Sequence, residues 1–329
     1  MSRESAAIDV DLVLAALGRG TQDEALRERY AQAGLHNWPD PQDDREDASI
    51  EAYWRYGFTL EFDETATQEP LLGVSGIEGP LTVSAALFYA DGVAGHTGWQ
   101  PALPFGLAFD MTPAEVAAVL GEPRASRAPY ELRVDQFLRG QYVLDVCYAP
   151  AGEGGIDFVS VRPQNIYETG RAVVTDMPWQ PLAESIGVPA DDAALLARLA
   201  SYVDASLVAA DLADDENTRF QRQSGLTFHG LAAKALGGSG RKICLAGFKM
   251  ARAGLHGSKG YTGQLPFGLL FGDGPETIGA KLPPDAQQSS HEAHGRYICE
   301  ANGLFFDVHY SLIHWQIIAV SVFHPALAD

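Results

Sequence analysis

The sequence feature that most constrains the fold is an internal repeat. The heptapeptide Leu-Pro-Phe-Gly-Leu-Ala-Phe at 103–109 returns as Leu-Pro-Phe-Gly-Leu-Leu-Phe at 265–271, and the separation of Leu103 from Leu265 defines the repeat offset. The similarity continues upstream, where Gly98 and Trp99 precede the first copy as Gly260 and Tyr261 precede the second. Because a repeat of this kind determines the architecture of the whole chain, the sequence predicts a tandem duplication. Its parts are the halves 1–165 and 185–329 and a docked linker, 166–184.

We expect the repeated heptapeptide to be a short strand that feeds a helix at once. Its apolar positions alternate around a proline that suits a strand edge and a glycine that suits a bulge. In the first copy the helix is expected at 114–120. Asp110 or Thr112 can cap this helix, and Glu115 can complete a capping box.

Other segments of the two halves also match. Both halves close on alternating apolar strands, which Pro163 and Pro325 end at the repeat offset. Upstream, an apolar helical stretch at 10–17 or 193–199 precedes a β-rich run at 81–89 or 241–250. Each half therefore reads as two helix-then-antiparallel-strand modules in series, and the fold class is an internally duplicated α+β. The expected closing strands are 142–148, 158–161, 304–310 and 318–322.

Length and composition fit two soluble domains. The chain has 329 residues, 46% of them hydrophobic, and lacks a run of 18 apolar residues, so a membrane span is excluded. The N-terminus leads into Asp9 and Asp11 instead of an apolar signal region, which predicts a cytoplasmic protein. An odd number of cysteines does not make a disulfide framework, so we expect Cys147, Cys244 and Cys299 to be buried reduced thiols.

Charge points to a protein partner. A net charge of −20 disfavours direct binding to nucleic acid and suits a basic partner. The stretch 217–272 contains no Asp or Glu but eight Lys or Arg, whereas 40–47 is strongly acidic. This acidic segment reads as an insertion unique to the first half, either a solvated loop or a partner-binding device. An aromatic anchor beside carboxylates is typical of a binding hot spot. The candidate contacts are therefore Trp38, Asp40, Asp43, Asp44, Glu46 and Asp47.

Residues able to carry catalysis or bind metal give little signal. His291 and His294 are three residues apart, whereas a zinc-binding helix presents histidines four apart, so a metal site is not expected. The glycine-rich stretch 236–242 lacks the Gly-Lys-Ser/Thr ending of a phosphate loop. Nor does any pair of carboxylates repeat between the halves; the repeated residues are those that pack, turn and stop strands. We therefore expect neither catalytic residues nor a cofactor, and predict a binding protein that is not an enzyme.

The stretch from Pro104 to Pro123 resembles the small αβ modules of the SmpA/BamE type, which occur in tandem in the beta-lactamase inhibitor protein. With the preceding Tyr-Gly-x-x-Leu-x-Phe segment, 56–62, the chain is also similar to immunity proteins that accompany secreted polymorphic toxins. The second copy departs from this pattern where Leu-Gly-Glu-Pro becomes Leu-Pro-Pro-Asp, 282–285. The resemblance implies a scaffold and a binding activity, and it carries over no catalytic residue.

These observations predict a cytosolic immunity protein that neutralises a cognate bacterial toxin by blocking its active site. The expected partner is a basic secreted toxin. Two alternatives stay open. One is a hydrolase with a carboxylate and histidine site between the halves, and the other is an assembly or regulatory module that binds proteins other than a toxin.

Overall fold

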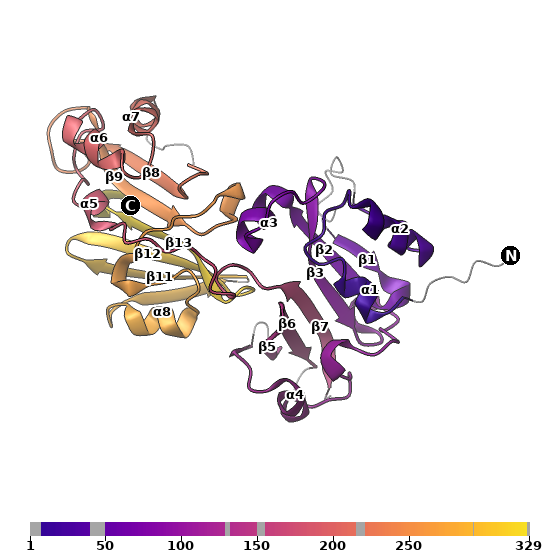
Figure 1. Cartoon of the computed structure of the whole chain (residues 1–329). Coiled ribbons are helices and arrows are strands. Elements are labelled where there is room, and N and C mark those ends of the chain that lie inside the picture. Colours follow the sequence, from indigo (N-terminus) through magenta and orange to yellow (C-terminus); the bar gives the residue numbers. More distant parts are fainter. Residues whose placement is uncertain are drawn as a thin grey trace. The chain divides into compact units, whose positions relative to one another are not determined.

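The chain forms two compact units, residues 1–166 and 167–329, each with a sheet of its own (Figure 1). They are seen in a computed structural model that describes residues 8–39, 50–128, 132–149, 155–214, 221–291 and 293–327. The predicted limits were 1–165, 166–184 and 185–329. Residues 167–184, predicted as a linker, lie within the second unit.

The first unit is built on a seven-stranded antiparallel sheet of order β1-β2-β3-β7-β6-β5-β4. Because β7, the last strand in sequence, pairs with both β3 and β6, the two expected modules share one sheet. The strands are β1 (Ile50–Tyr53), β2 (Phe58–Glu64), β3 (Leu81–Tyr89), β4 (Ala125–Arg127), β5 (Val134–Arg139), β6 (Tyr142–Tyr148) and β7 (Ile156–Pro163), and the helices are α1 (Val10–Leu14), α2 (Glu24–Gln32), α3 (Thr65–Leu72) and α4 (Pro113–Leu120).

The second unit repeats this topology with six strands, in the order β10-β11-β12-β13-β9-β8. Strands β8 to β13 thus match β2 to β7 one by one, and β1 has no counterpart among the described strands. The α+β class and the repetition of two similar sheets are confirmed. The strands are β8 (Leu226–Ala232), β9 (Ile243–Ala251), β10 (Gln287–His291), β11 (His294–Ala301), β12 (Leu304–Ser311) and β13 (Gln316–Phe323), and the helices are α5 (Gln180–Ala183), α6 (Ala193–Leu199), α7 (Ala205–Asp214) and α8 (Pro275–Lys281).

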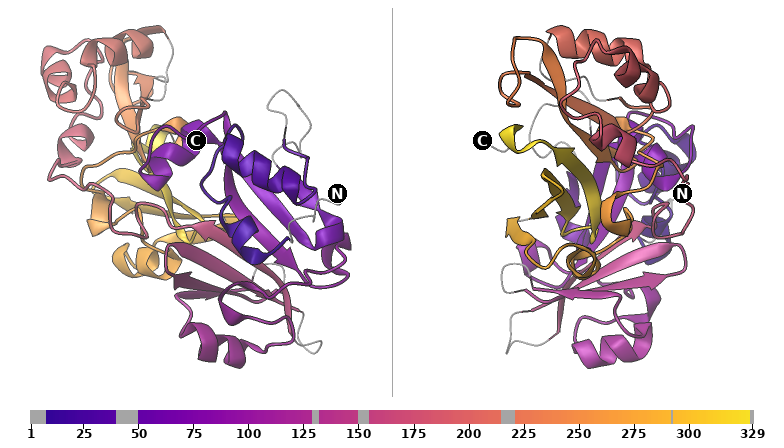
Figure 2. Two further views of the ribbon diagram at one scale, coloured as in Figure 1. Left: turned by 45° about the vertical axis from the view of Figure 1, so that its right-hand side comes forward. Right: turned by 90° about the vertical axis from the view of Figure 1, so that its left-hand side faces the viewer.

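The core of each unit lies on one face of its sheet. In the first unit, α1 and α2 lie across that face (Figure 2), and their Val13 and Tyr30 side chains are fully buried against it. The second unit buries Leu195 of α6 and Val208 of α7 in the same way. An apolar stripe on a short helix is stable only when it packs in this manner, because such helices are marginal alone.

The helices of the two units pair differently from the sequence-based prediction. The N–H of Gly18, just after α1, donates to the carbonyl of Val83 at 2.9 Å, and the N–H of Gly187, just after α5, donates to Leu245 at 2.7 Å. Val83 and Leu245 are separated by the repeat offset, so α5 is the counterpart of α1. Matching 10–17 with 193–199 was therefore wrong, because α6 corresponds to α2. The first element of the second repeat lies in the segment taken for a linker.

The repeated heptapeptide is a turn, so the predicted strand was wrong. Short 3₁₀ turns span Pro104–Gly106 and Pro266–Gly268, and their central residues Phe105 and Phe267 have φ of 62° and 57°. Proline fixes the first φ of a turn near −65°, and glycine accepts the positive φ that follows. A left-handed phenylalanine costs about 1–2 kcal/mol, and both units retain it. The leucines that flank each turn are buried, which gives the sequence its apolar alternation.

Candidate functional site

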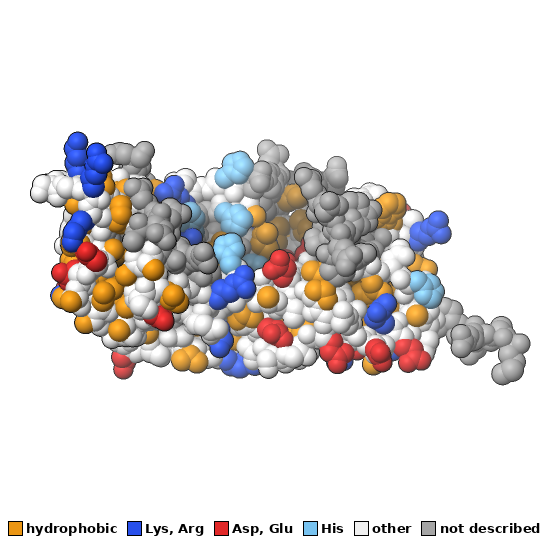
Figure 3. Space-filling model, turned by 90° about the horizontal axis from the view of Figure 1, so that it is seen from above, with side chains coloured by type: hydrophobic (Ala, Val, Ile, Leu, Met, Phe, Trp, Pro, Cys, Tyr) orange, Lys and Arg blue, Asp and Glu red, His pale blue; other side chains and the backbone are white. Residues whose placement is uncertain are grey.

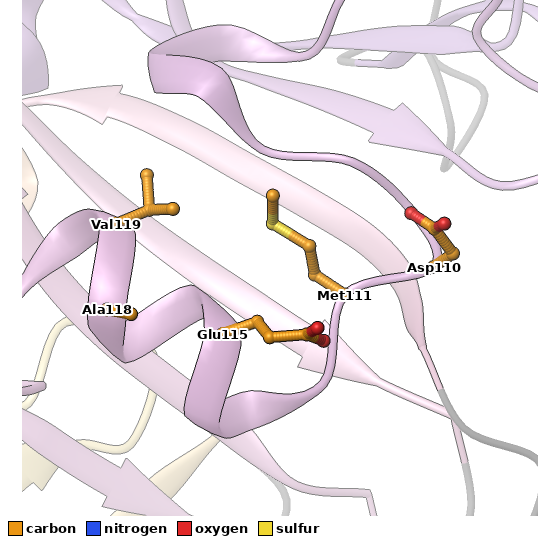
Figure 4. Close-up of a pocket in the computed structure, with 5 residues that line it drawn as sticks. All are labelled: Asp110, Met111, Glu115, Ala118 and Val119. Atoms are coloured by element: carbon orange, nitrogen blue, oxygen red, sulfur yellow. The ribbon is translucent and has the colours of Figure 1, made fainter.

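A hollow of about 410 Å³ opens on the first unit beside α4 (Figure 4). In Figure 4 the Met111 side chain stands next to the helix face that carries Ala118 and Val119, and Asp110 lies at the opposite end from Val119. The lining is thus apolar in the middle and carboxylate-bearing at one side. The lining residues are Asp110, Met111, Glu115, Ala118 and Val119.

The sequence at the start of α4 explains which residues face the hollow. Thr112 caps the helix, with Glu115 completing the predicted capping box: the N–H and hydroxyl of Thr112 each donate to Glu115 Oε2 at 2.8 Å. Val116 and Leu120 face the core, so Glu115, Ala118 and Val119 face outward at the i, i+3 and i+4 positions. The backbone hydrogen bond from Thr112 lowers the pKa of Glu115. The Glu115 carboxylate therefore caps the first turn of α4.

The repeated turn lies close to the last turn of α4. Phe105 is 37% exposed and Val119 is 38% exposed. A Cβ at Gly106 would lie 3.9 Å from Val119 Cγ1, and the Phe105 ring lies 6.1 Å from that of Tyr142. Arg139 Nη2 donates to the carbonyl of Val119 at 2.6 Å, which ties the end of α4 to β5. Exposed apolar side chains gathered at one place are the usual sign of an interaction site.

The second unit has an ion pair at the corresponding place. At the repeat offset, Asp273 stands where the first unit has Met111, and Lys281 stands where it has Val119. Lys281 Nζ lies 2.7 Å from Asp273 Oδ2 and 2.9 Å from the carbonyl oxygen of Gly268. The two copies therefore share a backbone and differ in what fills the space between the turn and the helix.

The two units also differ in net charge. Residues 1–166 contain 26 acidic and 11 basic residues, a net charge of −15, whereas residues 167–329 contain 17 and 12, a net charge of −5. On the face seen in Figure 3, Lys, Arg and His side chains gather on the part formed by the second unit. At the hollow, the carboxylate of Asp110 is exposed, and among the described residues it has no hydrogen-bond or ion-pair partner. The apolar hollow therefore belongs to a unit of strongly negative net charge and has two carboxylates in its lining, Asp110 and Glu115.

Of the predicted contact residues, Trp38 alone lies within the described chain. Its ring packs 5.2 Å from Tyr30 and 5.9 Å from Phe62, so it is partly buried against the core. The premise of a unique insertion was wrong: residues 33–57 connect α2 to β2, and residues 200–225 connect α6 to β8 over nearly the same length. The carboxylates Asp40, Asp43, Asp44, Glu46 and Asp47 lie outside the described residues.

One carboxylate that the prediction did not single out repeats between the halves. Asp145 on β6 and Asp307 on β12 are related by the repeat offset, and each accepts hydrogen bonds from an arginine. The sequence carried this signal, because both aspartates stand at the same position of the predicted closing strands. In the first unit the donors are Arg127 Nη2 and Gln136 Nε2, both at 2.9 Å.

In the second unit, Asp307 also binds a histidine. Arg296 donates to both carboxylate oxygens, at 2.9 and 3.0 Å, and His309 Nε2 lies 2.9 Å from Oδ2. Burial raises the pKa of Asp307, but the hydrogen bonds of His309 and Arg296 outweigh it and hold that pKa below its ordinary value. The arginine and histidine therefore hold this carboxylate ionised on the sheet.

The described residues give no support to a metal centre. No group of three or more His, Cys, Asp or Glu side chains among them is placed to hold a metal ion. His291 and His294 end β10 and begin β11 and pair with each other across that hairpin. Among the described residues, Cys147, Cys244 and Cys299 are buried and free.

Comparison with known proteins adds little. No family model matches the chain, and no curated protein matches it significantly. A solved structure of a DUF4309 family protein, YjgB from Bacillus subtilis, is similar over 42% of this chain and 76% of that one, at 15% identity and a TM-score of 0.25. A TM-score of this size does not establish a shared fold. No helix in the described part of the chain is long and apolar enough to cross a membrane.

Proposed function

We propose that this protein binds another protein and inhibits it, as an immunity protein blocks the active site of its cognate toxin in the cytoplasm. The observation that carries the proposal is the open apolar hollow beside α4, at a place where the second copy of the same fold holds an ion pair. A duplicated scaffold that changes one surface and keeps its core is free to use that surface for binding.

The charge of the first unit indicates the kind of partner. A net charge of −15 attracts a basic protein over several ångströms and raises its rate of association, while apolar contacts at the centre of an interface supply most of the affinity. A basic secreted toxin, such as one that acts on nucleic acid, has the complementary charge. The acidic segment that follows Trp38 belongs to the same unit and adds to this attraction.

A second candidate function is hydrolysis, and the His309–Asp307 pair favours it. A carboxylate 2.9 Å from a histidine nitrogen is the arrangement that orients a general base. Here, however, the same carboxylate also accepts both hydrogen bonds of Arg296, which is typical of an ion pair that links strands. Replacing His309 by Gln and screening ester, phosphodiester and peptide substrates separates the two functions, because a hydrolase would lose its turnover. A third candidate is an assembly module, which would bind a protein other than a toxin.

The test of inhibition is direct. The intact protein is mixed with the purified product of the neighbouring gene, and calorimetry measures the affinity while a toxicity assay of that product measures inhibition. We expect binding and a loss of toxin activity at equal concentrations. A toxin that stays fully active in the presence of excess protein would refute the proposal.

A charge-removed variant tests the contact residues predicted from the sequence. Replacing Asp40, Asp43 and Asp44 by Asn, Glu46 by Gln and Asp47 by Asn keeps Trp38 and its packing in place. If these carboxylates contact or steer the partner, association should slow several-fold and become less sensitive to salt. An unchanged association rate would show that these carboxylates take no part in binding, and the hollow would remain as the candidate contact.

A further inference from the structure

The second unit shows how this scaffold holds an ammonium group between its repeated turn and the helix that follows. The stem of Lys281 rises from α8, and its Nζ reaches the carbonyl oxygen of Gly268 at 2.9 Å and Asp273 at 2.7 Å. The turn and the helix that make this arrangement are present in both units. A lysine of the chain itself therefore occupies the place that stands open in the first unit.

The first unit keeps the carbonyl acceptor of the turn, lacks the cation, and has its carboxylate one position earlier, at Asp110, because Met111 replaces Asp273. Gly106 corresponds to Gly268, and its carbonyl oxygen has no hydrogen-bond partner among the residues that the structure describes. The carboxylate of Asp110 beside the hollow is likewise unpartnered within that part of the chain. Glu115 is committed to Thr112, so Asp110 is the carboxylate at this rim that a cation can bind.

The apolar part of the hollow suits the stem of a long basic side chain. Met111, Ala118 and Val119 line it. Lysine and arginine bury their methylene stems on such surfaces and keep the charged end at a polar rim. Methionine adds an adaptable contact, because its three rotatable bonds let it follow the shape of the occupant.

We infer that the hollow beside α4 is a binding site for a lysine or arginine side chain of a protein partner. The stem of that side chain lies on Val119 and Met111, and its cation binds the carboxylate of Asp110 at the other end of the hollow. The inference rests on the proposed function for the identity of the partner as a protein. It goes further by naming the group that is recognised and by explaining why one copy of the repeat binds and the other does not.

The test uses a small probe, so that it does not depend on the toxin. The intact protein is labelled on its methionine and valine methyl groups and titrated with acetyl-Gly-Lys-Gly-amide, followed by nuclear magnetic resonance. We expect saturable shifts at Met111 and Val119 with this peptide. Acetyl-Gly-norleucine-Gly-amide, which keeps the stem and lacks the charge, should bind about tenfold more weakly, since the charge-assisted hydrogen bonds are lost. Shifts of equal size with both peptides, or no shift at either methyl group, would overturn the inference.

A variant designed from the second unit supplies the control. Met111→Asp combined with Val119→Lys gives the first unit the ion pair that Asp273 and Lys281 form in the second. Because the second unit folds with this pair, the variant should keep its melting temperature. It should no longer bind the lysine peptide. Asp110→Asn should lower the affinity for the lysine peptide and leave the fold unchanged. Retention of full peptide affinity in the double variant would also overturn the inference.

The two proposals fail separately. If the toxin is inhibited and the double variant inhibits it equally well, the protein is an inhibitor that does not use this hollow. If the lysine peptide binds at Met111 and Val119 but no toxin is inhibited, the site stands and the inhibitory function falls.

Discussion

Replacing Gly57 by alanine should destabilise the first unit far more than replacing a left-handed glycine that has open space around it, such as Gly92. Gly57 precedes β2 with φ of 74°, and a Cβ there would lie 2.5 Å from the carbonyl oxygen of Gly98 and overlap the Trp99 backbone. The segment cannot retreat easily, because the N–H of Tyr89 donates to Gly57 and the N–H of Trp99 donates to Tyr89, both at 2.9 Å. The two strands and the turn meet at one point.

The size of the effect follows from two contributions. An alanine at positive φ costs about 1 kcal/mol, and an overlap with fixed backbone adds about 1–3 kcal/mol, as overpacking does in cores. Gly57→Ala should therefore cost about 3 kcal/mol. Gly92 has φ of 79° and open space around its Cβ position, so Gly92→Ala carries only the first contribution, about 1 kcal/mol.

Scanning calorimetry of the intact protein measures both variants. For a unit of this length, 1 kcal/mol corresponds to about 2–4 °C, so the first unit should melt about 10 °C lower in Gly57→Ala and about 3 °C lower in Gly92→Ala. Gly225→Ala should act on the second unit, because Gly225 packs against Gly260 and Tyr261 in the same way. If Gly57→Ala and Gly92→Ala lower the transition equally, the close approach does not stabilise the unit and the reasoning is wrong.

Three further predictions concern single side chains. Thr112→Ala should cost about 1 kcal/mol in urea unfolding by removing the helix cap; an unchanged midpoint would show that the cap contributes nothing. Asp307→Asn should cost about 2 kcal/mol at pH 7. Because the folded pKa of Asp307 is depressed, its contribution is present above the ordinary pKa of an aspartate and is lost as pH falls through the folded pKa, so the two proteins should converge in stability in acid. Burial raises the pKa of Cys147 to about 12 and that of Cys299 to about 11, so both thiols should resist alkylation at pH 8 until urea unfolds the chain; rapid labelling of the folded protein would contradict their burial.

The sequence predicted the strands well because their signal is local. Alternating apolar positions placed 142–148 at β6 and 81–89 at β3, and both ranges coincide with the observed strands. The capping box at Thr112 was also predictable, since it depends on two residues three apart. Periodicity and capping are properties of a few neighbouring residues, and no distant contact was needed to recognise them.

The strand predicted for the heptapeptide was wrong because a turn and a strand can show the same alternation of buried apolar residues. Leu103 and Leu107 are buried, as they would be on a strand, but Phe105 between them is left-handed. A positive φ at phenylalanine is unfavourable on its own, so only tertiary contacts hold it there, and no property of the sequence marks it. The helix pairing failed for a related reason, because α5 is too short to give a periodic signal.

Most of the candidate site was readable in principle. Aligning the copies at their common offset places Met111 against Asp273 and Val119 against Lys281, a change from an apolar pair to an ion pair. The sequence could not say that these two residues face each other, since they are eight positions apart with a cap and a helical turn between them. The structure supplies that proximity, and with it the contrast between an open and an occupied site.

The position of β7 in the sheet determines when, during synthesis, the sheet of the first unit can be completed. This strand, the last one made in its unit, hydrogen-bonds to β3 on one side and β6 on the other, so it is the only strand that joins the described sheet into one. A ribosome adds about 5–20 residues per second, and during the wait before residue 163 emerges the growing chain can make only two separate partial sheets. Until β7 is made, the edges of β3 and β6 are unpaired and can pair with strands other than β7. In the second unit β9 and β12 have to wait for β13 in the same way.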